Sequence, residues 1–146
     1  MSLVFRYVKS DKPAVPVTLR QRGEIKTTAL IDSGGDISLL PPFLATKVLG
    51  SVYLRKPPNQ TLRGISGMSK GVQCDIDICI TDGKESYTVK NVPFFIPREP
   101  RDFVIIGREV FFDFFDITFK HRLGEIILTP VSTECQKIGG QVSRVD

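Results

Sequence analysis

Apolar and polar residues alternate along much of this chain, a pattern typical of β-strands with one buried face. In the segment 74–80, one cysteine and three isoleucines alternate with polar positions, so these four side chains would share one face of a strand. Asp82-Gly83 follows as a two-residue hairpin signal, and the segment 87–96 supplies the returning strand. The pattern predicts a long β-hairpin in which Asp75 and Asp77 belong to a solvated face rather than to a metal site.

Several shorter segments predict further strands. Residues 15–20 read as a strand that Pro16 confines to a sheet edge or to the strand's start, because proline cannot donate a ladder hydrogen bond. In the segment 103–108 an apolar run, 103–106, ends in Gly107, which is typical of a strand buried on both faces. The remaining expected strands are 3–8, 25–32, 117–120 and 125–129.

Two segments favour short helices. Pro41-Pro42 and Gly50 bracket the first, which would place Phe43, Leu44 and Val48 on one face. Residues 109–116 predict the second, with four apolar side chains on one side.

Together these elements predict a mostly β fold with one or two short helices. We expect a single domain at 14–130, preceded by an N-terminal edge segment at 1–13 and followed by a tail at 131–146. The tail is polar and carries two adjacent glycines, so we expect it either to be disordered or to pair with a partner.

Charge and composition exclude several classes of function. The net charge of +4 is scattered without a basic block, which is weak support for nucleic-acid binding. No apolar run approaches the roughly 20 residues of a membrane helix, and the N-terminus lacks the pattern of a signal peptide. We therefore expect no nucleic acid and no membrane among the partners.

The cysteines and the histidine bear on compartment and metal. Three cysteines are an odd number, and Cys74 and Cys79 would point to opposite faces of their strand. Reduced thiols and a cytoplasmic location are the expectation. With one histidine, His121, in a Lys-His-Arg turn and no C-x-x-C, we expect neither a metal site nor a cofactor.

The strongest candidate for chemistry is Asp32-Ser33-Gly34 with Gly35, at the end of an apolar strand. A carboxylate buried beside apolar residues is costly, so its presence there suggests a functional role. Two glycines permit positive φ and the close approach of another group. The tripeptide alone is a weak signal, because all three residue types are common in turns.

A second unusual stretch is glycine-rich and lies between two expected strands. It includes Gly64, Ile65, Ser66 and Gly67, followed by Met68. It reads either as a simple hairpin tip or as a flap that closes over a ligand, with Ile65 or Met68 touching that ligand.

A single carboxylate can do little hydrolytic chemistry, whereas two about 3 Å apart share one proton and divide the roles of base and acid. The chain has no second Asp-Ser/Thr-Gly, so the second carboxylate would come from another copy. A two-fold axis at the turn would place Asp32 against Asp32 of its mate.

Three motifs resemble those of the retropepsins, the dimeric retroviral-type aspartic proteases. They are Ala-Leu-Ile-Asp-Ser-Gly-Gly-Asp at 29–36, the glycine-rich hairpin at 64–71, and Val-Ile-Ile-Gly-Arg at 104–108 before a short helix. Order and spacing match over residues 14–129. The resemblance implies a closed acid-protease β-barrel with one lobe per chain, and a homodimer acting on polypeptides.

The resemblance also implies roles for individual residues. Asp32 would be the catalytic acid, Ser33 would bond across the dimer axis, and Gly34 would let substrate approach. Gly35 stands where alanine is more usual, which leaves room for substrate.

Other matched positions would support the turn or cover the substrate. Asp36 and Arg108 match an acid and a base that pair beneath the active site through a bidentate bond. Gly107, directly before Arg108, would belong to the same structural support. Residues Gly64–Gly67 would form the flap tip over an extended peptide. The two ends of the chain do not match the interface strands of the viral enzymes.

The leading hypothesis is a homodimeric aspartic endopeptidase that cleaves extended peptides at apolar side chains through an activated water. The alternative is a catalytically weak or inactive module of the same fold that dimerises or binds peptide. Nucleic-acid binding, a third possibility, rests only on the basic pI of about 9.1.

Overall fold

The computed structural model describes residues 2–8, 11–51, 53, 57, 60–64, 67–131 and 142–144. It is mostly β, with two short α-helices, as the sequence predicts. In chain order the elements are β1 Leu3–Arg6, β2 Ala14–Arg20, β3 Glu24–Ile31, β4 Ser38–Leu39, α1 Pro42–Leu49, β5 Gln60–Gly64, β6 Gly67–Thr81, β7 Ser86–Pro97, β8 Val104–Ile106, α2 Phe111–Phe114, β9 Phe115–Lys120, η2 His121–Leu123, β10 Glu125–Pro130 and β11 Val142–Arg144.

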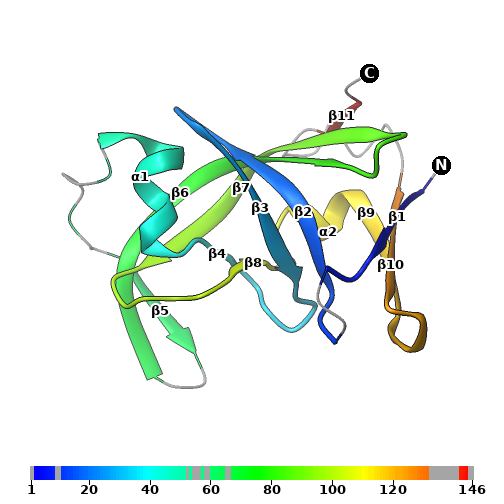
Figure 1. Ribbon diagram of the computed structural model, residues 1–146. Helices are drawn as coiled ribbons and strands as arrows, with labels where there is room; N and C mark the ends of the chain where they lie inside the picture. The colour runs from blue at the N-terminus through cyan, green and yellow to red at the C-terminus, as the bar shows by residue number, and fades with distance from the viewer. Residues whose placement is uncertain are drawn as a thin grey trace.

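Six of the strands close into a barrel (Figure 1). Its order is β7-β4-β8-β3-β2-β6, and the pairing of β6 with β7 completes the ring. Strand β5 extends the sheet beyond β6, and β11 extends it beyond β7. The expected closed barrel is therefore confirmed.

The long β6–β7 hairpin supplies much of the core. Ile76, Ile78 and Ile80 are at most 2% exposed, on the face that their alternation predicts. The register shifts between Ile76 and Ile78, and there the amide of Asn91 donates to Asp77 Oδ1 over 3.0 Å. Asp77 thus fixes an irregularity in the strand pairing, a role that the sequence did not suggest.

The helices differ from expectation in detail. In α1 the buried residues are Ala45, Val48 and Leu49, whereas Phe43, expected on the apolar face, is 63% exposed. The second helix spans only Phe111–Phe114, not 109–116, because Phe115 already pairs in β9 and the preceding Val110 has a φ of 70°. No helix in the described part of the chain is long and apolar enough to cross a membrane.

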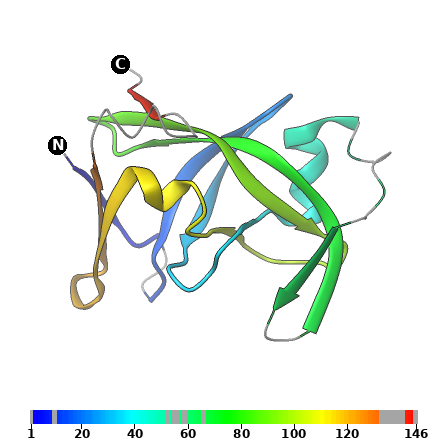
Figure 2. The same cartoon turned by 180° about the vertical axis from the view of Figure 1, so that it is seen from behind.

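A separate sheet of three strands, β1-β10-β9, stands beside the barrel (Figure 2). Leu3 pairs with Leu128 and Phe5 with Ile126, and these four side chains are all buried. The expected N-terminal edge strand is thus present. In the tail, β11 pairs with β7 of the same chain; the rest of the tail, 132–141 and 145–146, lies outside the described residues.

One carboxylate joins the two sheets. Asp82, in the turn between β6 and β7, accepts hydrogen bonds at Oδ1 from the amides of Lys84 and Glu85, both at 2.9 Å. Its Oδ2 accepts a longer one, 3.4 Å, from the amide of Val4 in β1. The Glu85 amide is the main reason that the pKa of Asp82 lies below its ordinary value, and slight burial opposes the shift.

We expect Asp82→Ala to lower the free energy of unfolding at neutral pH, and the loss to shrink in acid. A carboxyl whose pKa is depressed by folding contributes fully above its unfolded pKa of about 3.9 and loses that contribution as pH falls through the folded value. Urea unfolding at pH 7 and near pH 3 checks this, with exposed Asp75→Ala as the control. A loss that is equal at both pH values would contradict the role assigned to the charged carboxylate.

Candidate active site

The Asp-Ser-Gly turn leaves the barrel directly after β3. The amide of Asp32 donates to the carbonyl of Ile106 over 2.9 Å, continuing the parallel pairing of β3 with β8. The amide of Gly34 donates to Asp32 Oδ1, also over 2.9 Å, and Gly35 donates to the Asp32 carbonyl over 3.3 Å. The turn therefore fixes both the backbone and the carboxylate of Asp32.

One expectation about this turn, the burial of Asp32, is wrong for the single chain. Asp32 is exposed, not buried, because β3 ends at Ile31 and the turn carries the next residue out of the barrel. Neither Gly34 nor Gly35 has a positive φ. Glycine matters at Gly35 for close approach instead: a Cβ there would lie 3.1 Å from Asp32 Oδ2.

The segment after β8 holds the turn from beneath. The amide of Arg108 donates to the Gly35 carbonyl and the amide of Glu109 to the Asp36 carbonyl, both at 2.8 Å. With the bond between Asp32 and Ile106, these contacts fasten the turn at its start and at its end. We call residues 106–109 the clamp segment.

Gly107 lets the clamp segment approach closely. A Cβ at this position would lie 2.6 Å from the carbonyl oxygen of Ile37, so only glycine fits without a backbone shift. Its amide donates over 3.0 Å to the hydroxyl of Ser38, a residue that is fully buried. The sequence assigned Gly107 to structural support but missed Ser38; a lone serine between Ile37 and Leu39 was the available signal.

Asp36 and Arg108 form the ion pair that the resemblance implies. Nη2 of Arg108 donates to Oδ1 of Asp36, a single hydrogen bond among the described residues rather than a bidentate pair. The side chains are 54% exposed for Arg108 and 83% for Asp36. Because solvent screens so open a pair, we expect it to contribute about 1 kcal/mol or less within one chain.

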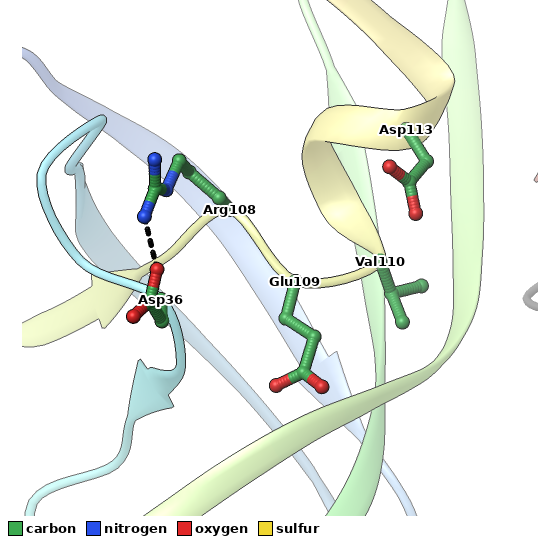
Figure 3. Close-up of a pocket in the computed structure, with 5 residues that line it drawn as sticks. All are labelled: Asp36, Arg108, Glu109, Val110 and Asp113. Atoms are coloured by element: carbon green, nitrogen blue, oxygen red, sulfur yellow. Dashed lines mark hydrogen bonds and ion pairs between the residues drawn. The ribbon is translucent and has the colours of Figure 1, made fainter.

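An open pocket of about 460 Å³ lies beside this ion pair (Figure 3). Asp36 and Arg108 form one side, and Glu109, Val110 and Asp113 complete the lining. Figure 3 shows the Arg108 guanidinium directed towards Asp36, away from Glu109 and Asp113. Asp32 does not line this pocket, so its chemistry is not provided here.

The glycine-rich stretch forms a hairpin of β5 and β6, with Gly64 paired to Gly67 at its end. Ile65 and Ser66, expected at the flap tip, lie outside the described residues. Met68, next to the tip, is 64% exposed. No hydrogen bond links the described part of this hairpin to the Asp32 turn within one chain.

The structure therefore joins some of the sequence-predicted residues and leaves others apart. Asp32, Gly34, Gly35, Asp36 and Arg108 form one hydrogen-bonded unit, and Gly107 beside Arg108 donates to the hydroxyl of Ser38. Ser33 is exposed in the turn, and its expected bond across a dimer axis stays a prediction. No group of three or more metal-binding side chains was found among the described residues.

Comparisons with known proteins agree with this geometry. A family model described as "Retroviral aspartyl protease" matches residues 9–114. The crystal structure of a retropepsin-like aspartic protease from Rickettsia conorii is similar, with a TM-score of 0.67 and 15% sequence identity over 99% of this chain and 94% of that one. At that identity the likeness shows the fold alone. No curated protein sequence matches.

We expect Gly107→Ala to lower the free energy of unfolding by roughly 1–3 kcal/mol or more, because the new methyl group would overlap the backbone at Ile37. Chemical denaturation checks this. Gly34→Ala is the matched control, since its Cβ would make only an ordinary contact, 3.4 Å from Asp32 Oδ1. Equal stability of the two variants would show that the clamp segment does not depend on close approach at Gly107.

Proposed function

This chain belongs to the retroviral aspartyl protease family, and on that premise we propose that it is a homodimeric aspartic endopeptidase. Its two Asp32 carboxylates, one from each copy, would activate a water that hydrolyses a peptide bond. Neither metal nor covalent intermediate takes part in this proposal.

The observation that carries the proposal is the state of Asp32 in one chain. Its carboxylate is oriented by the Gly34 amide and its backbone is tied to the barrel at Ile106. Nevertheless it is exposed, although Ile31, the residue before it and the last of β3, is buried. A carboxylate held this firmly at the surface is suited to meet a second one across a two-fold axis.

Two such carboxylates would divide the chemistry. Held about 3 Å apart they cannot both ionise, so the pair retains one proton and titrates as a unit. The ionised carboxylate takes a proton from the water, and the water oxygen attacks the carbonyl carbon of the peptide bond. The protonated member donates its proton to the carbonyl oxygen, and a tetrahedral diol forms.

Breakdown of this intermediate returns the protons. The carboxyl group that received the water proton gives it to the amide nitrogen, and the other carboxylate takes a proton from a diol hydroxyl. The C–N bond then breaks and releases a carboxylic acid and an amine. The clamp segment keeps each carboxylate in place throughout, because Asp32 and Gly35 both bond to it through the backbone.

The β5–β6 hairpin supports an extended polypeptide as the substrate. It is a two-stranded arm whose exposed Met68 lies one residue from the tip pair Gly64 and Gly67. Such an arm can cover a peptide bound in a strand-like conformation, with backbone hydrogen bonds for affinity and apolar pockets for specificity. The cytoplasmic location inferred from the cysteines stays a prediction.

We expect Asp32→Asn to reduce peptide cleavage between pH 4 and 7 by about 10²–10⁴-fold or more, because an amide cannot exchange the proton. A fluorogenic peptide library with apolar residues at the scissile bond measures this, and pepstatin should inhibit the wild type. Asp102→Asn, an exposed site outside the turn, is the control. Activity that survives Asp32→Asn would refute the assignment; peptide binding without cleavage by the wild type would favour the alternative of an inactive binding module.

We also expect the specific activity of the wild type to fall on dilution. If each site needs two chains, the active fraction falls with total concentration once that concentration is below the dimer Kd. Initial rates per chain, measured alongside sedimentation velocity over several decades of concentration, check this. Full activity at concentrations where only monomer sediments would overturn the two-chain site.

A further inference from the structure

The outer edge of β9 has no strand partner among the described residues. Strand β9 is the last strand of the β1-β10-β9 sheet, and no other described segment makes a backbone hydrogen bond to its far side. The opposite edge of this sheet is formed by β1, and there the Val4 amide donates a hydrogen bond to Asp82 Oδ2. An open strand edge presents unpaired N–H and C=O groups that can pair with a strand of another chain.

The sequence of β9 is complementary to itself. From Asp116 to Lys120 it reads acidic, apolar, threonine, apolar, basic. If two copies pair antiparallel with Thr118 opposite Thr118, then Asp116 faces Lys120 of the partner subunit, and Ile117 faces Phe119 of the partner subunit. An isologous two-fold contact requires this property, because each residue must accept its counterpart in both directions.

The exposure of the side chains agrees with such pairing. Ile117 and Phe119 lie on the buried face of the sheet, opposite Leu128 and Ile126, which are fully buried. Phe119 is nevertheless 37% exposed, because the sheet ends at β9. A strand added at this edge would cover it with an apolar neighbour.

The charged residues agree as well. Asp116, Thr118 and Lys120 are exposed on the other face, and no ion pair involves Asp116 or Lys120 among the described residues. Within the chain Lys120 lies opposite Glu125 in the ladder, so an acidic neighbour on its free side would complete a row of alternating charge.

The β9–η2–β10 hairpin extends in the same direction as the loop that follows β3. In Figures 1 and 2, which differ by a turn about the vertical axis, the hairpin, the loop after β3 and the end of the β5–β6 arm all extend towards the bottom of the molecule. A second copy that meets this chain at Asp32 would therefore approach the side to which the β9–η2–β10 hairpin extends.

We propose that β9 pairs with β9 of a second copy, in antiparallel register centred on Thr118, and that this joins the two three-stranded sheets into one sheet of six. The proposal deepens the proposed function and rests on it in requiring two copies to meet at Asp32. In the viral enzymes the interface strands come from the chain ends, which this sequence does not match. Here the interface strand would be β9, which lies inside the domain.

Charge exchange tests the register. Asp116→Lys and Lys120→Asp each replace two attractive pairs by two like-charge pairs in the symmetric dimer, so each should raise the dimer Kd roughly tenfold or more. The double variant restores opposite charges and should recover most of that loss. Lys26→Asp, an exposed site on β3, is the control. Sedimentation equilibrium gives the Kd, and wild-type values for both single variants would overturn the proposal.

Cross-linking tests the centre of the register. Directly opposed residues in an antiparallel pair have Cα atoms about 4.5–5.5 Å apart, within the range that a disulfide spans. Thr118→Cys should therefore form a covalent dimer under mild oxidation. Thr28→Cys, an exposed threonine on β3, and the wild type with its own cysteines give the background. A yield no greater than that background would overturn the register.

The two proposals fail separately. A covalent Thr118→Cys dimer that does not cleave peptides would leave the strand pairing intact and overturn the protease. Cleavage that falls on dilution but does not respond to Asp116→Lys or Lys120→Asp would leave the protease intact and overturn the pairing.

Discussion

The arrangement of the site depends on the close contact between the clamp segment 106–109 and the turn that carries Asp32. Backbone hydrogen bonds connect the two segments at Asp32, Gly35 and Asp36, and the buried hydroxyl of Ser38 takes the Gly107 amide. The contact is possible because position 107 has no side chain. A loop fixed by the backbone of a barrel strand can hold a carboxylate in one orientation although solvent surrounds it. The exposed ion pair between Asp36 and Arg108 adds to a geometry that the backbone already sets.

This constraint explains why one chain is only half of the proposed enzyme. The turn directs Asp32 out of the barrel, and the open pocket beside Asp36 and Arg108 does not include it. A single exposed carboxylate has no second carboxylate beside it with which to share a proton and hold a catalytic water. Two copies would supply both features, and the self-complementary edge of β9 would give them a second place of contact. The site and the interface would then follow from the same symmetry.

Some differences from expectation have a common physical cause, the contacts that a segment makes with the rest of the fold. The second helix is short because Phe115 is taken up by β9, and Phe43 is exposed because α1 turns Ala45, Val48 and Leu49 to the core. The acidic residues of β6, read as a solvated face, include Asp77, which holds the irregularity at Asn91. In each case a local pattern was compatible with two arrangements, and contacts with distant segments selected one.

The sequence by itself determined the mostly β architecture, the family and the turn that carries Asp32, because these depend on alternation, turn residues and short motifs that lie close together in the chain. It also placed Asp36 opposite Arg108, through the resemblance of two motifs 72 residues apart. Only the tertiary structure decided that Asp32 is exposed, that the Ser38 hydroxyl accepts the Gly107 amide, and that no described strand pairs with the outer edge of β9. Those properties arise where segments distant in sequence meet, and burial and hydrogen bonding there depend on how the barrel closes.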